Sequence, residues 1–97
     1  METNIKAIHF DISEKLTSFI NKKIEKLTRR YPDVMTADIS LKVIKPESAL
    51  NKQAIVSLTV PQEPDIVADK TADTFEEAID LCVEALDRQL EKIKNKK

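Results

Sequence analysis

The sequence contains no glycine and no tryptophan, and it has one cysteine among its 97 residues. Because glycine supplies the backbone freedom needed where a chain wraps closely around a phosphate, its absence excludes phosphate loops and dinucleotide-binding fingerprints. The single cysteine, Cys82, cannot form an intrachain disulfide and lies on an apolar helical stripe. We therefore expect it to pack as a small hydrophobic residue in a protein of the reducing cytoplasm.

Aromatic residues, long apolar runs and histidines are also scarce. Three phenylalanines and one tyrosine are too few for a platform that stacks single-stranded bases. No apolar run approaches the roughly 18–20 residues that span a membrane, and the N-terminus lacks a charged-then-apolar signal segment. The one histidine, His9, offers neither a metal cluster nor a partnered nucleophile, and we interpret it as a structural residue on the first strand. We therefore predict no catalytic residue, no metal, no cofactor, no small-molecule substrate and no membrane partner.

The chain carries 16 basic and 17 acidic residues, so its net charge predicts no affinity for nucleic acid. The basic and acidic residues are nevertheless segregated along the sequence. Six acidic residues and no basic residue lie within 73–87, whereas 88–97 hold five basic residues against one acidic residue, Glu91. Residues 14–30 form a second basic segment, with six basic residues against two acidic ones. Any affinity for RNA has to come from these two segments.

Apolar periodicity predicts two helices and four strands. Apolar residues recur every three or four residues through 14–30. Ser13, just before this range, can accept backbone N–H groups as an N-cap, and Pro32, just after it, disfavours helix in the residue before it. The same spacing runs through the C-terminal segment, whereas the central segments alternate like half-buried strands. The predicted elements are a strand at 4–10, a helix at 14–30, strands at 34–44, 54–60 and 65–71, and a helix at 73–97.

This β-α-β-β-β-α order predicts an α+β fold, a two-layer sandwich of a four-stranded sheet and two helices. Each helix has one apolar stripe, so both should pack side by side on one sheet face and leave the other face to solvent. We interpret the central strands as a hairpin and 65–71 as an edge strand, because prolines precede it. We expect one domain over 1–97, with a frayed tail at about 94–97.

The basic residues of both helices are candidates for binding phosphate. Cations near a helix C-terminus also complement the helix dipole, and the residues alone leave this structural explanation open. The dipole does not explain Lys15, Lys22 and Lys23, which lie in the first or middle turns of their helix, whereas phosphate binding explains both basic segments. The candidate residues are Lys22, Lys23, Lys26, Arg29, Arg30, Arg88, Lys92 and Lys96.

Two C-terminal strings, 72–81 (ADTFEEAIDL) and 86–90 (LDRQL), resemble the signature of the ribosome hibernation-promoting factor and ribosome-associated inhibitor family. The resemblance extends to Asn4 through His9 and to Ile12-Ser13-Glu14, and it spans essentially the whole chain in the short form of the family. It implies a cytoplasmic bacterial protein of stress and stationary phase that binds the small ribosomal subunit, where messenger and transfer RNA would sit. Such a protein silences translation without catalysis.

The resemblance also implies which residues hold ribosomal RNA. The matching positions are Lys23, Lys26 and Arg29 on the first helix and Arg88, Lys92 and Lys96 on the second. Two positions depart from the family pattern, because Ala85 stands where many members carry a lysine and Glu91 interrupts the basic end. We therefore expect affinity to depend more on the first helix.

Two functions of other classes stay open from the residues. The chain can be a protein-interaction module that docks a partner through the acidic half of its last helix or through the open sheet face. A small enzyme is the least favoured, because acidic pairs such as Glu76 with Glu77 or Asp80 with Glu84 line a helix start where the dipole favours negative charge. We interpret those pairs as a solvated face.

Overall fold

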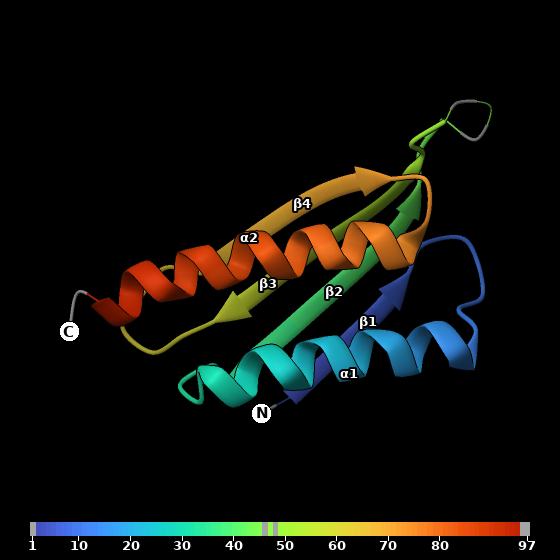
Figure 1. Cartoon of the computed structure of the whole chain (residues 1–97). Helices are drawn as coiled ribbons and strands as arrows, with labels where there is room; N and C mark the ends of the chain where they lie inside the picture. Colours follow the sequence, from blue (N-terminus) through green and yellow to red (C-terminus); the bar gives the residue numbers. More distant parts are fainter. Residues whose placement is uncertain (1, 46, 48, 96–97) are drawn as a thin grey trace.

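The computed structural model describes residues 2–45, 47 and 49–95, and it confirms the predicted element order (Figure 1). The predicted helix at 14–30 has the predicted bounds, and α2 is helical through Asn95. Of the tail predicted at 94–97, residues 96–97 lie outside the described part of the chain, and so does the candidate Lys96. The elements are β1 (Glu2–Ala7), α1 (Glu14–Arg30), β2 (Thr36–Val43), β3 (Lys52–Thr59), β4 (Ile66–Ala72) and α2 (Phe75–Asn95).

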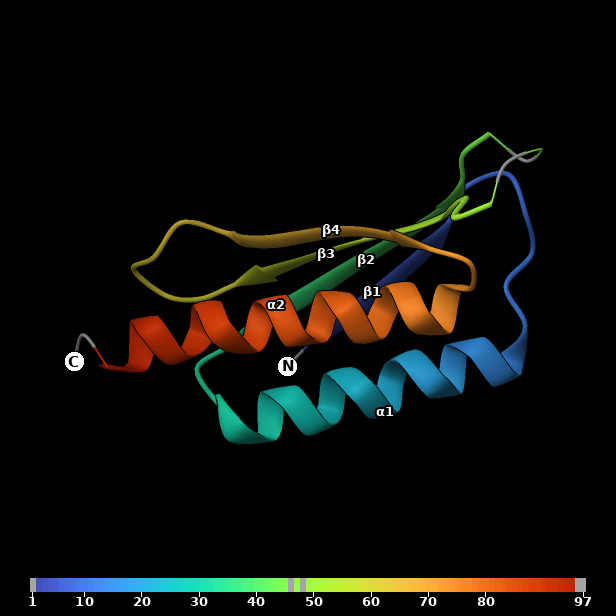
Figure 2. The ribbon, with the colours of Figure 1, turned by 45° about the horizontal axis from the view of Figure 1, so that its top comes forward.

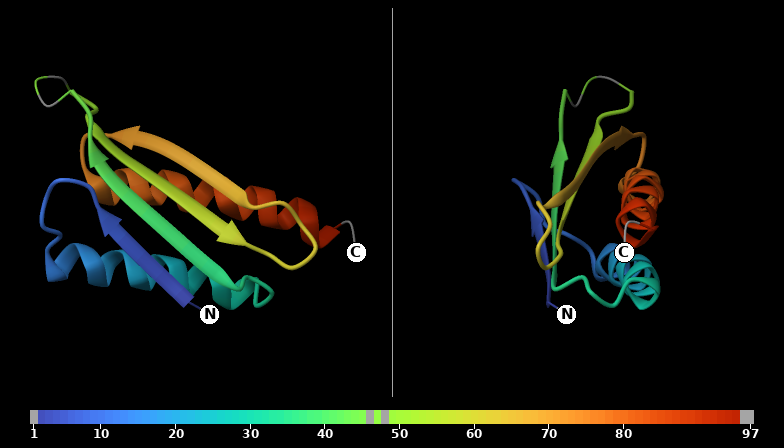
Figure 3. Two further views of the ribbon diagram at one scale, coloured as in Figure 1. Left: turned by 180° about the vertical axis from the view of Figure 1, so that it is seen from behind. Right: turned by 90° about the vertical axis from the view of Figure 1, so that its left-hand side faces the viewer.

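The four strands form one mixed sheet in the order β1-β2-β3-β4. β1 pairs parallel to β2 through the α1 crossover, whereas β2 with β3 and β3 with β4 pair antiparallel, which confirms the predicted hairpin and edge strand. Both helices lie on the same face of the sheet, and no helix in the described part of the chain covers the opposite face (Figures 2 and 3). The two-layer α+β sandwich is therefore confirmed.

The core lies between the sheet and the helices, where the inward residues of the strands meet the apolar stripes of both helices. The register places Ile39 beside Val56 and Val56 beside Ala68, and all three are buried. Cys82 is fully buried on α2, and its Sγ lies 3.3 Å from the Ala54 carbonyl oxygen. Burial raises the pKa of this thiol to about 11. Cys82 therefore packs as a small hydrophobic residue, as predicted.

The first helix begins and ends at the residues that local chemistry predicts. Ser13 has an extended backbone, and its Oγ accepts a hydrogen bond from the Leu16 N–H at 3.1 Å, which satisfies one of the free donors of the first turn. At the other end, Tyr31 caps the helix by donating its N–H to the Thr28 carbonyl oxygen at 3.1 Å. Pro32 follows at once, so the helix does not continue.

The prediction of a first strand reaching residue 10 is wrong, and so is the placement of His9 on it. β1 ends at Ala7, and His9 has a left-handed backbone with φ of 63° in a bend. The bend carries Phe10 out of the sheet and onto the ring of Phe75, with centroids 5.1 Å apart and planes 11° from parallel. The gain from this aromatic packing favours the bend over a longer strand.

Candidate RNA-binding surface

Two ion pairs show how the helices lie relative to each other. Lys23 Nζ lies 2.9 Å from Asp80 Oδ1, and Arg30 Nη2 lies 3.1 Å from Asp87 Oδ1. Each pair links residues 57 positions apart, since 80 minus 23 and 87 minus 30 both give 57. The helices therefore run parallel and in register, side by side on the sheet (Figures 1 and 2). Both C-terminal ends, where the helix dipoles favour cations, lie at the same end of the molecule.

The predicted cations of α1 divide into two sets. Lys22, Lys26 and Arg29 are exposed, and Arg29 contacts Glu25 of its own helix at 2.9 Å. The other set, Lys23 and Arg30, turns toward α2 and pairs with its carboxylates. Among the described residues, neither Lys22 nor Lys26 forms an ion pair. Among the candidate residues of α1, these two lysines are therefore the most available to an external anion.

The two described candidate cations of α2, Arg88 and Lys92, point away from the sheet and not toward α1. Arg88 follows Asp87, which contacts α1, and precedes Gln89, whose Nε2 donates to the Val67 carbonyl oxygen of β4 at 3.3 Å. At about 100° per residue, Arg88 therefore points to solvent between these two directions. Lys92 has the same position one turn later, and both side chains are exposed.

A row of acidic residues separates the exposed cations of α1 from those of α2. Asp80, Asp87 and Glu91 lie on the side of α2 that faces α1 and contact its residues. Asp80 was interpreted as part of a solvated face, and the structure instead places it in an ion pair. The reason is the parallel register of the helices, which brings each acid beside an α1 residue 57 or 60 positions earlier.

A shallow groove runs between the helices and is the hollow that suits an anion best. Its volume is about 150 Å³, and its lining includes both partners of the Arg30–Asp87 pair and the cation of the Lys23–Asp80 pair. Lys26 lies at this groove without an acidic partner among the described residues. The groove is lined by Lys23, Lys26, Leu27, Arg30, Val83 and Asp87.

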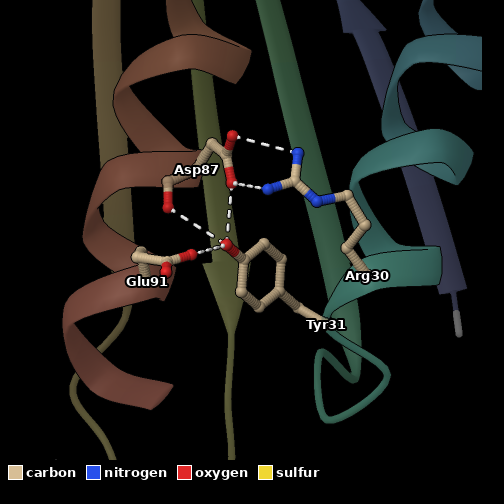
Figure 4. Close-up of polar contacts among 4 residues, drawn as sticks. All are labelled: Arg30, Tyr31, Asp87 and Glu91. Carbon is tan, nitrogen blue, oxygen red and sulfur yellow. Dashed lines mark hydrogen bonds and ion pairs between the residues drawn. The ribbon is translucent and has the colours of Figure 1, made fainter. Parts of the chain in front are cut away.

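Where α1 ends, four side chains form a polar cluster across the two helices (Figure 4). The Tyr31 hydroxyl lies 2.8 Å from Asp87 Oδ1 and 2.8 Å from Glu91 Oε2, and Arg30 contacts both oxygens of Asp87 at 3.1 Å. Burial raises the pKa of Tyr31 above its ordinary range, and the hydrogen bonds to the two carboxylates raise it further. The cluster therefore joins α1 to α2 in one protonation state, the neutral phenol.

Tyr31 is buried in the core and caps α1. The sequence does not predict the contacts of its hydroxyl with Asp87 and Glu91, which lie 56 and 60 positions away. No local spacing reports such contacts. The one available signal was the coincidence of a tyrosine at the end of one amphipathic helix with two acids, one turn apart, near the end of the other.

Other kinds of site were sought in the described part of the chain. No three histidine, cysteine, aspartate or glutamate side chains among the described residues lie close enough together to hold a metal ion. Neither helix, as far as the structure describes it, has the length and apolar character needed to cross a membrane.

Comparison with known proteins places these features in a family. The family model described as sigma 54 modulation protein / S30EA ribosomal protein matches residues 3–97. A ribosome hibernation promoting factor of Azotobacter vinelandii is 29% identical over 96 residues, which cover 99% of this chain and 85% of the relative. A protein of the same description from Pseudomonas putida is 26% identical over 96 residues, covering 99% and 89%.

Two solved structures share the fold. A ribosomal subunit interface protein from Coxiella burnetii superposes with a TM-score of 0.87 at 23% identity, covering 98% of this chain and 99% of the other. The N-terminal domain of Thermus thermophilus Protein Y superposes with a TM-score of 0.77 at 17% identity, covering 93% and 94%. At these identities the likeness shows the fold alone.

Proposed function

Because the chain belongs to the sigma 54 modulation protein / S30EA ribosomal protein family, we propose that it is a hibernation factor that binds the small ribosomal subunit in the cytoplasm. The cations on the outer sides of α1 and α2 hold phosphates of ribosomal RNA. The bound protein then blocks the sites of messenger and transfer RNA by occupying them. This mechanism uses steric exclusion and requires no catalytic residue and no cofactor.

The observation that carries this proposal is the row of exposed cations on each helix, on the side that the sheet does not cover. Lys22 and Lys26 on α1 and Arg88 and Lys92 on α2 are all exposed. A chain with net charge −1 concentrates these charges on one layer of the molecule. Such contacts with phosphates fix position without reading base sequence and make binding steeply dependent on salt.

The alternative of a protein-docking module has weaker support from the geometry. The carboxylates Asp80 and Asp87 already contact α1, so the acidic face is partly occupied within the chain. On the open sheet face, Asn4 donates to Asp38 at 3.0 Å, and Val67 of edge strand β4 is 49% exposed. That face offers polar pairs with little apolar surface, whereas the cores of protein interfaces are apolar and depleted in charge.

Co-sedimentation with purified bacterial small subunits at low salt tests the function. We expect the protein to sediment with the subunits and to be released as salt rises. Absence of co-sedimentation would overturn the proposal. Binding that salt does not weaken, or that survives RNA digestion, would favour the protein-docking alternative.

A double charge reversal tests the surface. Lys26→Glu with Arg88→Glu removes one exposed cation from each helix, and each lost phosphate contact makes the negative slope of log affinity against log salt shallower by about 1. We therefore expect the slope to become shallower by about 2 in total. The melting temperature should be nearly unchanged, because both side chains are exposed. The matched control is Lys6→Glu with Lys42→Glu, which makes the same charge change at exposed positions of β1 and β2. Equal binding by the two double variants would refute the surface.

A further inference from the structure

The two ion pairs between the helices differ in how firmly the carboxylate is held. Asp87 receives two contacts from Arg30 and one from the Tyr31 hydroxyl. Asp80 contacts Lys23 alone among the ion pairs of the described residues. The side chains of Lys23 and Asp80 are 39% and 48% exposed, so water and ions reach both. Asp80, which pairs with the groove residue Lys23, is therefore the acid that an external anion can displace.

The Lys23–Asp80 pair contributes little to holding the helices together. Exposed pairs of this kind add little to the stability of a fold, whereas apolar side chains of both helices are buried beneath the groove. The pair does, however, occupy the charge of Lys23. Lys23 Nζ also lies 5.4 Å from the centroid of the Phe19 ring, so this second contact favours the same position when the carboxylate is absent.

An RNA phosphate that reaches Lys26 in the groove meets two cations already neutralised by carboxylates. It replaces Asp80 at Lys23 only when the carboxylate moves away, because two anions cannot share one ammonium group without repulsion. We propose that Asp80 is an intramolecular competitor of phosphate, which lowers RNA affinity by holding Lys23 until RNA displaces it. This inference rests on the proposed function and adds a residue that sets the strength of binding.

A double-mutant cycle between Lys23 and Asp80 tests the competition, with affinities measured for purified small subunits and for polyuridylate over a range of salt. Asp80→Asn frees Lys23, so we expect affinity for both probes to rise about 2- to 5-fold, the range that one exposed ion pair represents. The slope of log affinity against log salt becomes steeper by about 0.7, the value for one further phosphate contact on a single strand. In the wild-type protein, Lys23→Gln weakens binding less than Lys26→Gln does. In the Asp80→Asn background, Lys23→Gln and Lys26→Gln lower the affinity by the same factor.

The matched control is Glu84→Gln, which makes the same change in net charge at an exposed position one turn further along α2. We expect it to raise affinity less than Asp80→Asn and to leave the cost of Lys23→Gln unchanged. An equal gain from both substitutions, or a cost of Lys23→Gln that does not depend on Asp80, would overturn the competition and leave the proposed function standing. Failure of every protein to bind either probe would overturn both. A thermal melt of each variant shows that the fold is retained.

Discussion

Replacing Tyr31 by phenylalanine removes one hydroxyl from the contact between α1 and α2. The ring stays, so the buried apolar surface changes little, but both contacts of 2.8 Å to Asp87 and Glu91 are lost. A hydrogen bond to a charged acceptor contributes about 1.5–3 kcal/mol, and we take the low end because Glu91 is exposed and regains water. We therefore expect Tyr31→Phe to lower the free energy of unfolding by about 1.5 kcal/mol at neutral pH. That corresponds to a decrease of about 6–12 °C in melting temperature.

The raised pKa of the Tyr31 hydroxyl also predicts how the difference in unfolding free energy between the wild-type protein and Tyr31→Phe depends on pH. Because the pKa of Tyr31 is raised in the folded state, its contribution is complete below the unfolded pKa of about 10 and is lost as pH rises above it. The loss is at most about 1.36 kcal/mol per pH unit, and solvent screening limits its total size and not this slope. The wild-type protein therefore loses its advantage over Tyr31→Phe between about pH 10 and pH 11.5. Cys82, which also titrates in this range, is present in both proteins and cancels.

Urea denaturation followed by circular dichroism, at neutral and alkaline pH, measures both quantities. Tyr31 is the one tyrosine of the chain and there is no tryptophan, so tyrosinate absorbance reports this hydroxyl alone. In the folded protein, we expect tyrosinate to form only as the protein unfolds. An equal stability of the two proteins at neutral pH, or a difference that stays constant to pH 11.5, would refute the role of the cluster.

Two further predictions concern the backbone and the buried thiol. Leu50 has a φ of 54° and a side chain that is 58% exposed, so Leu50→Gly should stabilise the protein by about 0.5–1 kcal/mol in urea denaturation, whereas Leu50→Ala should not. Stabilisation by alanine equal to that by glycine would contradict this reasoning. Burial and a pKa of about 11 should make Cys82 react with a thiol reagent about 100-fold or more slowly in the folded than in the unfolded protein, as measured near pH 8 with and without urea. Equal rates in the two conditions would show that the thiol is accessible.

Most of the fold could be predicted because it depends on local patterns. Ser13, Pro32 and a stripe of apolar residues define α1 without reference to any other element. Alternation alone identifies the inward residues of β2 and β3, such as Ile39 and Val56, since the side-chain period of a strand is two. The first strand is the exception. A run of apolar residues does not reveal that Phe10 gains more by packing on Phe75 than by continuing β1.

The candidate cations could be named from the sequence, but their surroundings could not. Helical periodicity places Lys23 and Arg30 on the margin of α1 and does not say which neighbour they meet there. Their partners depend on the parallel register of α1 and α2, which is set by how both helices pack on the sheet. A separation of 57 residues in each ion pair is a property of the whole fold. The sequence therefore predicts the cations of the surface and not the acids that compete for them.

The change from acidic to basic residues at Arg88 has a different meaning in three dimensions from its meaning in the sequence. In the sequence, Glu91 interrupts the basic end of α2, but in the structure it contacts Tyr31 on the side of α1, whereas Arg88 and Lys92 point to solvent. Glu91 therefore interrupts the basic residues along the sequence but not on the surface, and the outer side of α2 keeps its cations together. Glu91 belongs to the cluster that joins the helices, so its negative charge supports the relative position of the two cationic rows. The acidic residues on this side of α2 thus position the surface and, through Asp80, limit its affinity.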